Sequence, residues 1–128
     1  MKNISALTIF LFGASVFIAS AADFPSRPIR MLAGFSAGGG SDLAARTVAQ
    51  KMSEALGQSV VVDNRTGATG AIAAEMLAKA PRDGYTLMML AVAQLSATAF
   101  DDKLPFDVVR DFAGVSLVSR VPGGAPSG

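Results

Sequence analysis

The sequence predicts an α/β protein whose core is an open parallel sheet. Segments typical of strands alternate with segments typical of helices, in the order strand, helix, strand, helix, strand. Two of the strand segments lead directly into glycine-rich turns, which open the helices that follow. The strand segments are apolar at most positions, as is typical of strands covered on both faces. At 128 residues, the chain has room for one modest domain.

The first 21 residues differ in character from the rest. Lys2 is the only charge before Asp23, and a nearly continuous apolar run ends in Ala19-Ser20-Ala21. A basic start, an apolar run and a small-x-small ending predict a secretory signal peptide over residues 1–21. The alternative is a single membrane anchor, because the run approaches the length that spans a bilayer. No basic cluster follows the run, which favours the signal peptide.

Composition restricts the chemistry that the chain can perform. Without residues 1–21 the chain carries equal numbers of basic and acidic residues and shows no stripe of Lys or Arg, which argues against nucleic acid as a partner. His and Cys are both absent. The sequence therefore lacks the usual general base, the commonest metal ligand, disulfides and a lipoprotein anchor. We expect no metal and no cofactor.

The first strand is expected at residues 29–33, after an extended leader that contains two prolines. A glycine-rich loop follows at residues 34–40. Ser41 or Asp42 is the predicted N-cap of a helix in which apolar residues recur at helical spacing. Gly57 is the predicted left-handed residue that ends this helix.

The second strand is expected at residues 59–63, where Val60-Val61-Val62 is a run typical of a fully buried strand. A turn follows at residues 64–67. Ala68 or Thr69 is predicted to open a second helix that runs to Ala80 and stops at Pro81.

The remaining chain predicts two further strands. A third strand is expected at residues 85–90, followed by a loop with a short helix at residues 91–99. A polar connection covers residues 101–111, and a fourth strand is expected at residues 113–119. Residues 122–128 have the composition of a linker.

Two loops are the strongest candidates for a binding site. In an open parallel sheet, ligands bind beyond the carboxyl ends of the strands, which is where Phe35–Asp42 and Thr66–Gly70 fall. Glycines let N–H groups approach a ligand, and the first turn of a helix has free N–H groups and a partial positive charge. Together these features predict an anion site that needs no Lys or Arg. The candidate ligand-binding residues are Phe35, Ser36, Ala37, Gly38, Gly39, Gly40, Asp42, Thr66, Gly67, Ala68, Thr69, Gly70 and Gln94. The alternative is that both loops are ordinary tight turns and that Asp42 is only a helix cap.

Enzymatic motifs in the same loops are incomplete. Gly34-Phe35-Ser36-Ala37-Gly38 fits the nucleophile elbow of a serine esterase, but such an enzyme needs a His base and the chain has none. Gly38-Gly39-Gly40 begins like a dinucleotide fingerprint, yet Leu43 stands where the third glycine is needed, and no Lys completes a P-loop. We therefore expect a protein that is not an enzyme.

Several motifs occur in order along the chain. They are Pro25-Ser26-Arg27-Pro28-Ile29-Arg30, Gly38-Gly39-Gly40-Ser41-Asp42, Val62-Asp63-Asn64-Arg65-Thr66-Gly67-Ala68-Thr69-Gly70, Asp83-Gly84-Tyr85-Thr86-Leu87, and Phe106-Asp107 with Asp111-Phe112. On these motifs the chain from Asp23 to Val121 resembles the receptors of tripartite tricarboxylate transporters, the Bug-type periplasmic solute-binding proteins.

The resemblance implies a two-lobed, type II-like periplasmic binding fold, of which this chain carries the parallel-sheet lobe. It also implies a periplasmic location, transporter subunits in the inner membrane as partners, and a monomeric full-length receptor. The ligand would be a small organic carboxylate: a di- or tricarboxylate, an amino acid or an aromatic acid. The loops that match Phe35–Asp42 and Thr66–Gly70 would hold the carboxylate, largely through main-chain groups and ordered water.

The chain departs from the family pattern in two ways. Members of the family are well over twice as long, so we expect an N-terminal fragment: a partial lobe at residues 22–121 and a linker-like tail at residues 122–128. A truncated gene product without binding function is the main alternative. Residues 92–96 also replace a loop that is usually richer in Ser, Thr and Asn, which leaves the identity of the ligand open.

Overall fold

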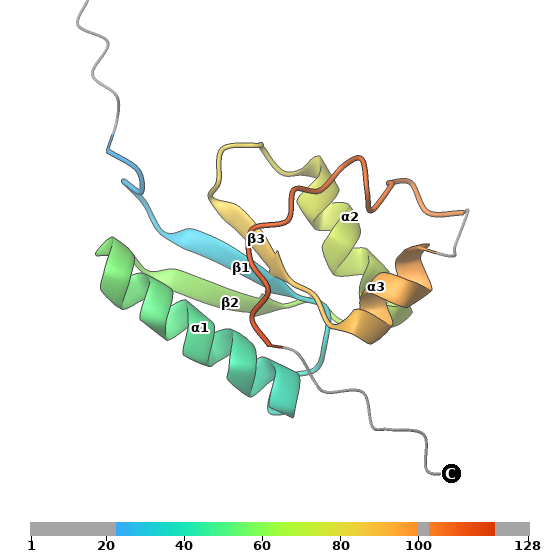
Figure 1. The fold of residues 1–128 in the computed structure, drawn as a ribbon, viewed down its shortest axis with the longest axis horizontal. Helices are drawn as coiled ribbons and strands as arrows, with labels where there is room; N and C mark the ends of the chain where they lie inside the picture. Colours follow the sequence, from blue (N-terminus) through green and yellow to red (C-terminus); the bar gives the residue numbers. More distant parts are fainter. Residues whose placement is uncertain (1–22, 100–102, 120–128) are drawn as a thin grey trace, which may run out of the picture.

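A three-stranded parallel sheet forms the centre of the structure (Figure 1). The structure, a computed structural model, describes residues 23–99 and 103–119; the predicted signal peptide and tail lie outside these ranges. The strands are β1 (Ile29–Ala33), β2 (Val60–Asn64) and β3 (Thr86–Met89), in the order β2-β1-β3. This arrangement confirms the predicted α/β class. In the described ranges, no helix has the length and apolar character needed to cross a bilayer.

Helix α1 (Gly40–Leu56) covers one face of the sheet (Figure 1). Its buried residues Ala45 and Ala49 lie against Met31 of the central strand, and half-buried side chains from β2 and β3 complete the cluster. Alanine has the smallest apolar side chain, so the helix backbone can lie close to the sheet. The predicted end of this helix is confirmed, because Gly57 has φ +65° and its N–H donates to the carbonyl of Ser53.

Helix α2 (Ala71–Lys79) covers the opposite face (Figure 1). Ala71 and Ala74 pack with Phe106, which comes from the polar connection after the last helix. A further helix, α3 (Val92–Ala99), follows β3 and confirms the short helix expected there. The sheet therefore carries helices on both faces, as a parallel sheet requires.

Two predictions about the strands are wrong. The valine run of β2 is not fully buried: Val61 is 54% exposed, because β2 is an edge strand of the sheet and α2 does not extend over it. Residues 113–119 form no strand, and Val115 is 82% exposed. The described residues offer these apolar residues no neighbouring strand, and a β-strand needs a hydrogen-bonded neighbour.

The predicted starts of two helices are also corrected. The N-cap of α1 is Gly39, not Ser41 or Asp42, and it makes no side-chain cap. The regular part of the second helix begins at Ala71, because residues 68–70 form a separate 3₁₀ turn, η1, with left-handed backbone at Thr69. Asp42 lies inside the first turn of α1, and its carboxylate reaches back to the N–H of Gly38 in the preceding loop instead of capping the helix.

The central strand should dominate stability. Leu32 is fully buried, so Leu32→Ala should lower the free energy of unfolding by about 2–5 kcal/mol, through lost burial and the cavity left behind. Leu43 on α1 is 69% exposed, so Leu43→Ala should change the free energy of unfolding by less than about 0.5 kcal/mol. Urea unfolding followed by circular dichroism measures both. Equal losses would contradict this description of the core.

Candidate functional site

Two loops leave the sheet side by side. In the parallel register of β1 and β2, Ala33 stands opposite Asn64, so both strands end at the same edge. We call residues 34–39 the first loop and residues 65–70 the second loop. The N–H of Arg65 donates to the carbonyl of Ala33 at 2.7 Å, which joins the second loop to the end of β1. The proximity that the sequence predicts for these loops is therefore confirmed.

The first loop presents backbone to solvent. Residues 36–40 are all exposed, and they lead into the first turn of α1, where N–H groups have no partner within the helix. Gly39 offers no side chain to cap them. A shallow hollow of about 240 Å³ lies here, lined by Gly38, Gly39, Gly40, Asp42, Leu43 and Arg46. Backbone donors and the positive end of the helix dipole therefore face an open surface.

The second loop has an unusual backbone. Gly67, Ala68, Thr69 and Gly70 all have positive φ, at 125°, 45°, 53° and 87°. Residues with a side chain rarely adopt this region, and such strained positions concentrate at ligand sites. Residues 66–69 are exposed, while Gly70 is buried. The loop thus turns sharply and keeps its outer peptide groups accessible.

Asp42 is buried, with only 3% of the residue exposed. One carboxylate oxygen accepts hydrogen bonds from the N–H of Gly38 and from Nε of Arg46, both at 2.9 Å, and the other accepts from Nδ2 of Asn64 at 3.0 Å. The bonds from Arg46, Gly38 and Asn64 together lower the pKa of Asp42 to about 2, although burial opposes them. Three donors hold this carboxylate inside the loop, so its contacts are with the protein itself.

Asn64 was not among the predicted site residues. Its Nδ2 donates to the carbonyl of Phe35 at 3.1 Å as well as to Asp42, and its Oδ1 accepts from Arg46 at 3.2 Å. It therefore ties the first loop to the end of β2. Its position directly at the carboxyl end of a strand was a signal that could have identified it. The i, i+4 spacing of Asp42 and Arg46 was a second such signal.

Phe35 and Gln94 were predicted to contact the rest of a ligand. Phe35 is half-buried and packs against the core cluster under α1. Gln94 is 7% exposed; its Nε2 donates to the carbonyl of Gly34 at 2.8 Å, and its Oε1 accepts from the N–H of Ala91 at 3.2 Å. The structure places both residues at the base of the loops.

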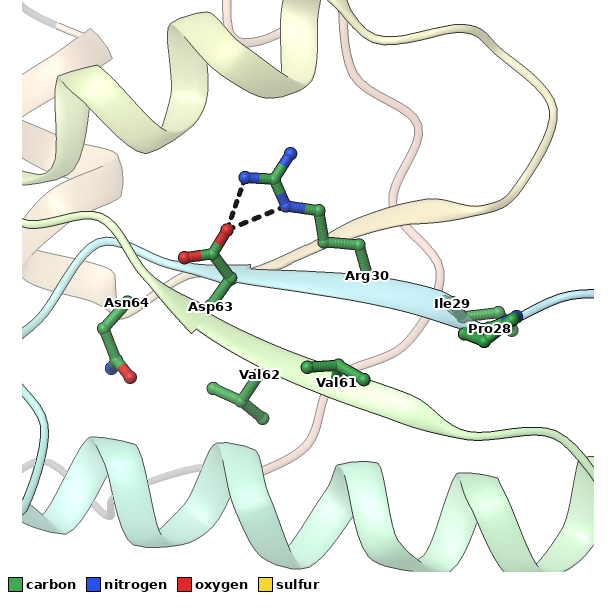
Figure 2. A pocket seen from close by; sticks show the side chains of 7 residues that line it. All are labelled: Pro28, Ile29, Arg30, Val61, Val62, Asp63 and Asn64. Atoms are coloured by element: carbon green, nitrogen blue, oxygen red, sulfur yellow. Dashed lines mark hydrogen bonds and ion pairs between the residues drawn. The ribbon is translucent and has the colours of Figure 1, made fainter.

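A larger hollow, of about 620 Å³, lies along β1 and β2 and is lined by residues 28–30 and 61–64 (Figure 2). Arg30 and Asp63 point toward each other on the face away from α1, and Nε of Arg30 lies 2.8 Å from the carboxylate. Asp63 also pairs with Arg65 at 2.9 Å. Hydrogen bonds from Arg30 and then Arg65 lower the pKa of Asp63. One carboxylate thus faces two guanidinium groups, and among the described residues no group of three or more acidic residues is placed to hold a metal ion.

Comparison with known proteins places the chain in context. The family profile described as tripartite tricarboxylate transporter family receptor matches residues 44–125. BugT of Bordetella pertussis is 37% identical over 124 residues, which cover 94% of this chain and 38% of BugT. The chain spans about a third of the length of the curated relatives that it matches.

Solved structures give the same result. MatC of Rhodopseudomonas palustris, solved with bound malate, superposes with a TM-score of 0.64 at 34% identity, over 70% of this chain and 31% of MatC. A second R. palustris protein, solved with adipate, has a TM-score of 0.50 at 47% identity, over 52% of this chain and 22% of its own.

The ionised form of Asp42 should contribute to stability. Because the pKa of Asp42 is lowered in the folded state, this contribution is present above about pH 4 and is lost as the pH falls toward 2. Asp42→Asn should therefore be less stable at pH 7, with a flatter stability profile between pH 4 and 2. The contribution of Asp63, whose pKa is also lowered, remains in the variant. Parallel profiles in urea unfolding at a series of pH values would contradict this role for Asp42.

Proposed function

The chain belongs to the tripartite tricarboxylate transporter receptor family, and we propose that it forms one wall of a site that binds a small organic carboxylate. The observation that carries this proposal is the pairing of two glycine-rich loops at one edge of the sheet. Both lead into helical turns and both expose main-chain groups. In open α/β sheets, this edge is where ligands bind.

Main-chain N–H groups of Ser36–Gly40 and Thr66–Gly70 would supply the hydrogen bonds. Those of Gly38 and Gly70 are the exceptions, because they already donate to Asp42 and to the carbonyl of Gly67. Each hydrogen bond to a charged group contributes roughly 1.5–3 kcal/mol, so three or four suffice for one carboxylate. No cationic side chain is required. Arg46, which lines the smaller hollow beside the first loop, is paired with Asp42. Phe35 would flank the ligand from the base of the first loop.

The relatives support a carboxylate as the class of ligand. The two R. palustris proteins were solved with malate and with adipate, which are both dicarboxylates. Within this class the proposal covers di- and tricarboxylates, amino acids and aromatic acids. We further propose that the protein acts in the periplasm after export by its N-terminal segment, delivers its ligand to inner-membrane transporter subunits, and is monomeric in its longer form.

Gly39 allows a direct test of the backbone site. Its φ of −84° and ψ of 172° suit any residue, and the nearest atom to an added Cβ is the carbonyl oxygen of Ser36 at 3.8 Å. Gly39→Ala should therefore fold normally, yet its methyl group would stand where a carboxylate approaches. We expect malate and adipate affinity to fall about tenfold or more. Titration of the ¹⁵N-labelled chain, followed by amide shifts of both loops, measures this.

Two further variants make the test specific. Gly114 belongs to neither loop and an added Cβ there meets open space, so Gly114→Ala should bind like the wild type. Ser36→Ala keeps the main-chain N–H and should lose less affinity than Gly39→Ala. Equal binding by Gly39→Ala and Gly114→Ala would refute the site. Absence of binding by the wild type would favour the alternative, a chain without binding function.

The affinity of this chain alone should be low. The loops are exposed, so a bound carboxylate would stay in contact with water, which weakens each electrostatic interaction. A two-lobed receptor instead closes around its ligand and expels water. A difference of about 4 kcal/mol corresponds to roughly a thousandfold in affinity, so millimolar rather than micromolar dissociation constants are expected. Micromolar binding by calorimetry would show that the two loops suffice alone.

A further inference from the structure

The side chain of Gln94 lies against Gly34 of the first loop and Gly70 of the second. It is buried, and its carboxamide both donates and accepts: Nε2 donates to the carbonyl of Gly34 in the first loop, and Oε1 accepts from the N–H of Ala91, two residues after β3. Helix α3, which carries Gln94, also contacts the turn η1 of the second loop. Gln94 thus joins three chain segments that follow three different strands.

The glycines of the loops show how tightly this amide fits. An added Cβ at Gly34 would lie 2.8 Å from Nε2 of Gln94 and 2.8 Å from the Cα of Gly70. An added Cβ at Gly70 would lie 2.7 Å from the same Nε2. All three distances are too short for real atoms, so the two backbones and the carboxamide fill this space completely. A shift of the amide must therefore be transmitted to both loops.

We propose that Gln94 is a positioning residue, which sets the separation of the two loops and thereby aligns their N–H groups on one carboxylate. This inference rests on the proposed function. A carboxylate accepts hydrogen bonds strongly only within a narrow range of distance and angle, so donors from two separate loops need a fixed spacing. Gln94 supplies that spacing without touching the ligand.

Two substitutions separate the amide from the volume that it fills. Gln94→Glu keeps the shape but, when ionised, removes the N–H that Gly34 accepts from. Gln94→Met keeps the approximate length and removes the donor to Gly34 and the acceptor for Ala91. Each should weaken malate and adipate binding about tenfold, the size of one net hydrogen-bond contribution. Affinities are measured by amide-shift titration of the full chain at a temperature where thermal unfolding shows every variant to be folded.

Val48→Ala is the control for a merely structural role. Val48 lies on α1 and packs, half-buried, in the core cluster around Met31, on the face of the sheet opposite α2. Val48→Ala should therefore lower the midpoint of thermal unfolding without changing the dissociation constants for malate and adipate. If Gln94 acts only through general stability, Val48→Ala should weaken binding as much as the Gln94 variants do. That result, or wild-type affinity in both Gln94 variants, would overturn the proposal.

A readout without ligand distinguishes this proposal from the proposed function. In both Gln94 variants, the backbone amide shifts of the first and second loops should change together, and Val48→Ala should leave them in place. If the wild type binds neither acid, the proposed function fails, while the joint shift still supports the spacing role. Changes confined to residues 91–96 would refute it, because the amide would then act only within its own segment.

Discussion

The parallel pairing of β1 with a strand on each side is the constraint on which the rest of the structure depends. Every described helix is placed relative to this central strand, either by packing on it or by following a strand that pairs with it. Parallel pairing also brings the carboxyl ends of all three strands to one edge, so the segments that follow them must share a small space. The candidate site is a consequence of that crowding.

Two separate sets of hydrogen bonds hold the loops in place at the carboxyl edge of the sheet. On the α1 side, Asp42 and Asn64 bind the first loop to the end of β2. On the α2 side, Gln94 binds the same loop to the segment after β3. The loops therefore expose main-chain donors while side chains below them supply rigidity. Preorganised donors lose little entropy on binding, which suits recognition by the backbone alone.

The sequence predicted the fold well where local rules and tertiary structure agree. Hydrophobic runs predicted the strand at residues 29–33 and the alternation of strands and helices. The tendency of glycine to adopt positive φ predicted the end of α1 at Gly57. The structure has all of these as expected. The prediction failed where the neighbouring elements of the fold decide whether a segment is a buried strand. Val61 and residues 113–119 are apolar enough for buried strands, but sequence does not reveal which strand will lie at an edge.

For the candidate site, sequence located the loops but assigned some side chains differently. Asp42 fits the pattern of a cap or a ligand contact, yet its bonds run to Gly38, Arg46 and Asn64. The left-handed turn at Ala68 and Thr69 was also missed, because neither residue favours positive φ and only tertiary contacts impose it. Long-range partners of this kind are not encoded in local spacing.

Gly34 differs from Gly39 and Gly40 in its evolutionary prospects. At Gly34 any side chain collides with Gln94 and Gly70, whereas at Gly39 and Gly40 an added Cβ meets open space or ordinary contact. Drift at the open positions can therefore reshape what the surface accepts while the fold stays intact. A lineage carrying this loop can explore new ligands by single substitutions, without first acquiring compensating changes in the core.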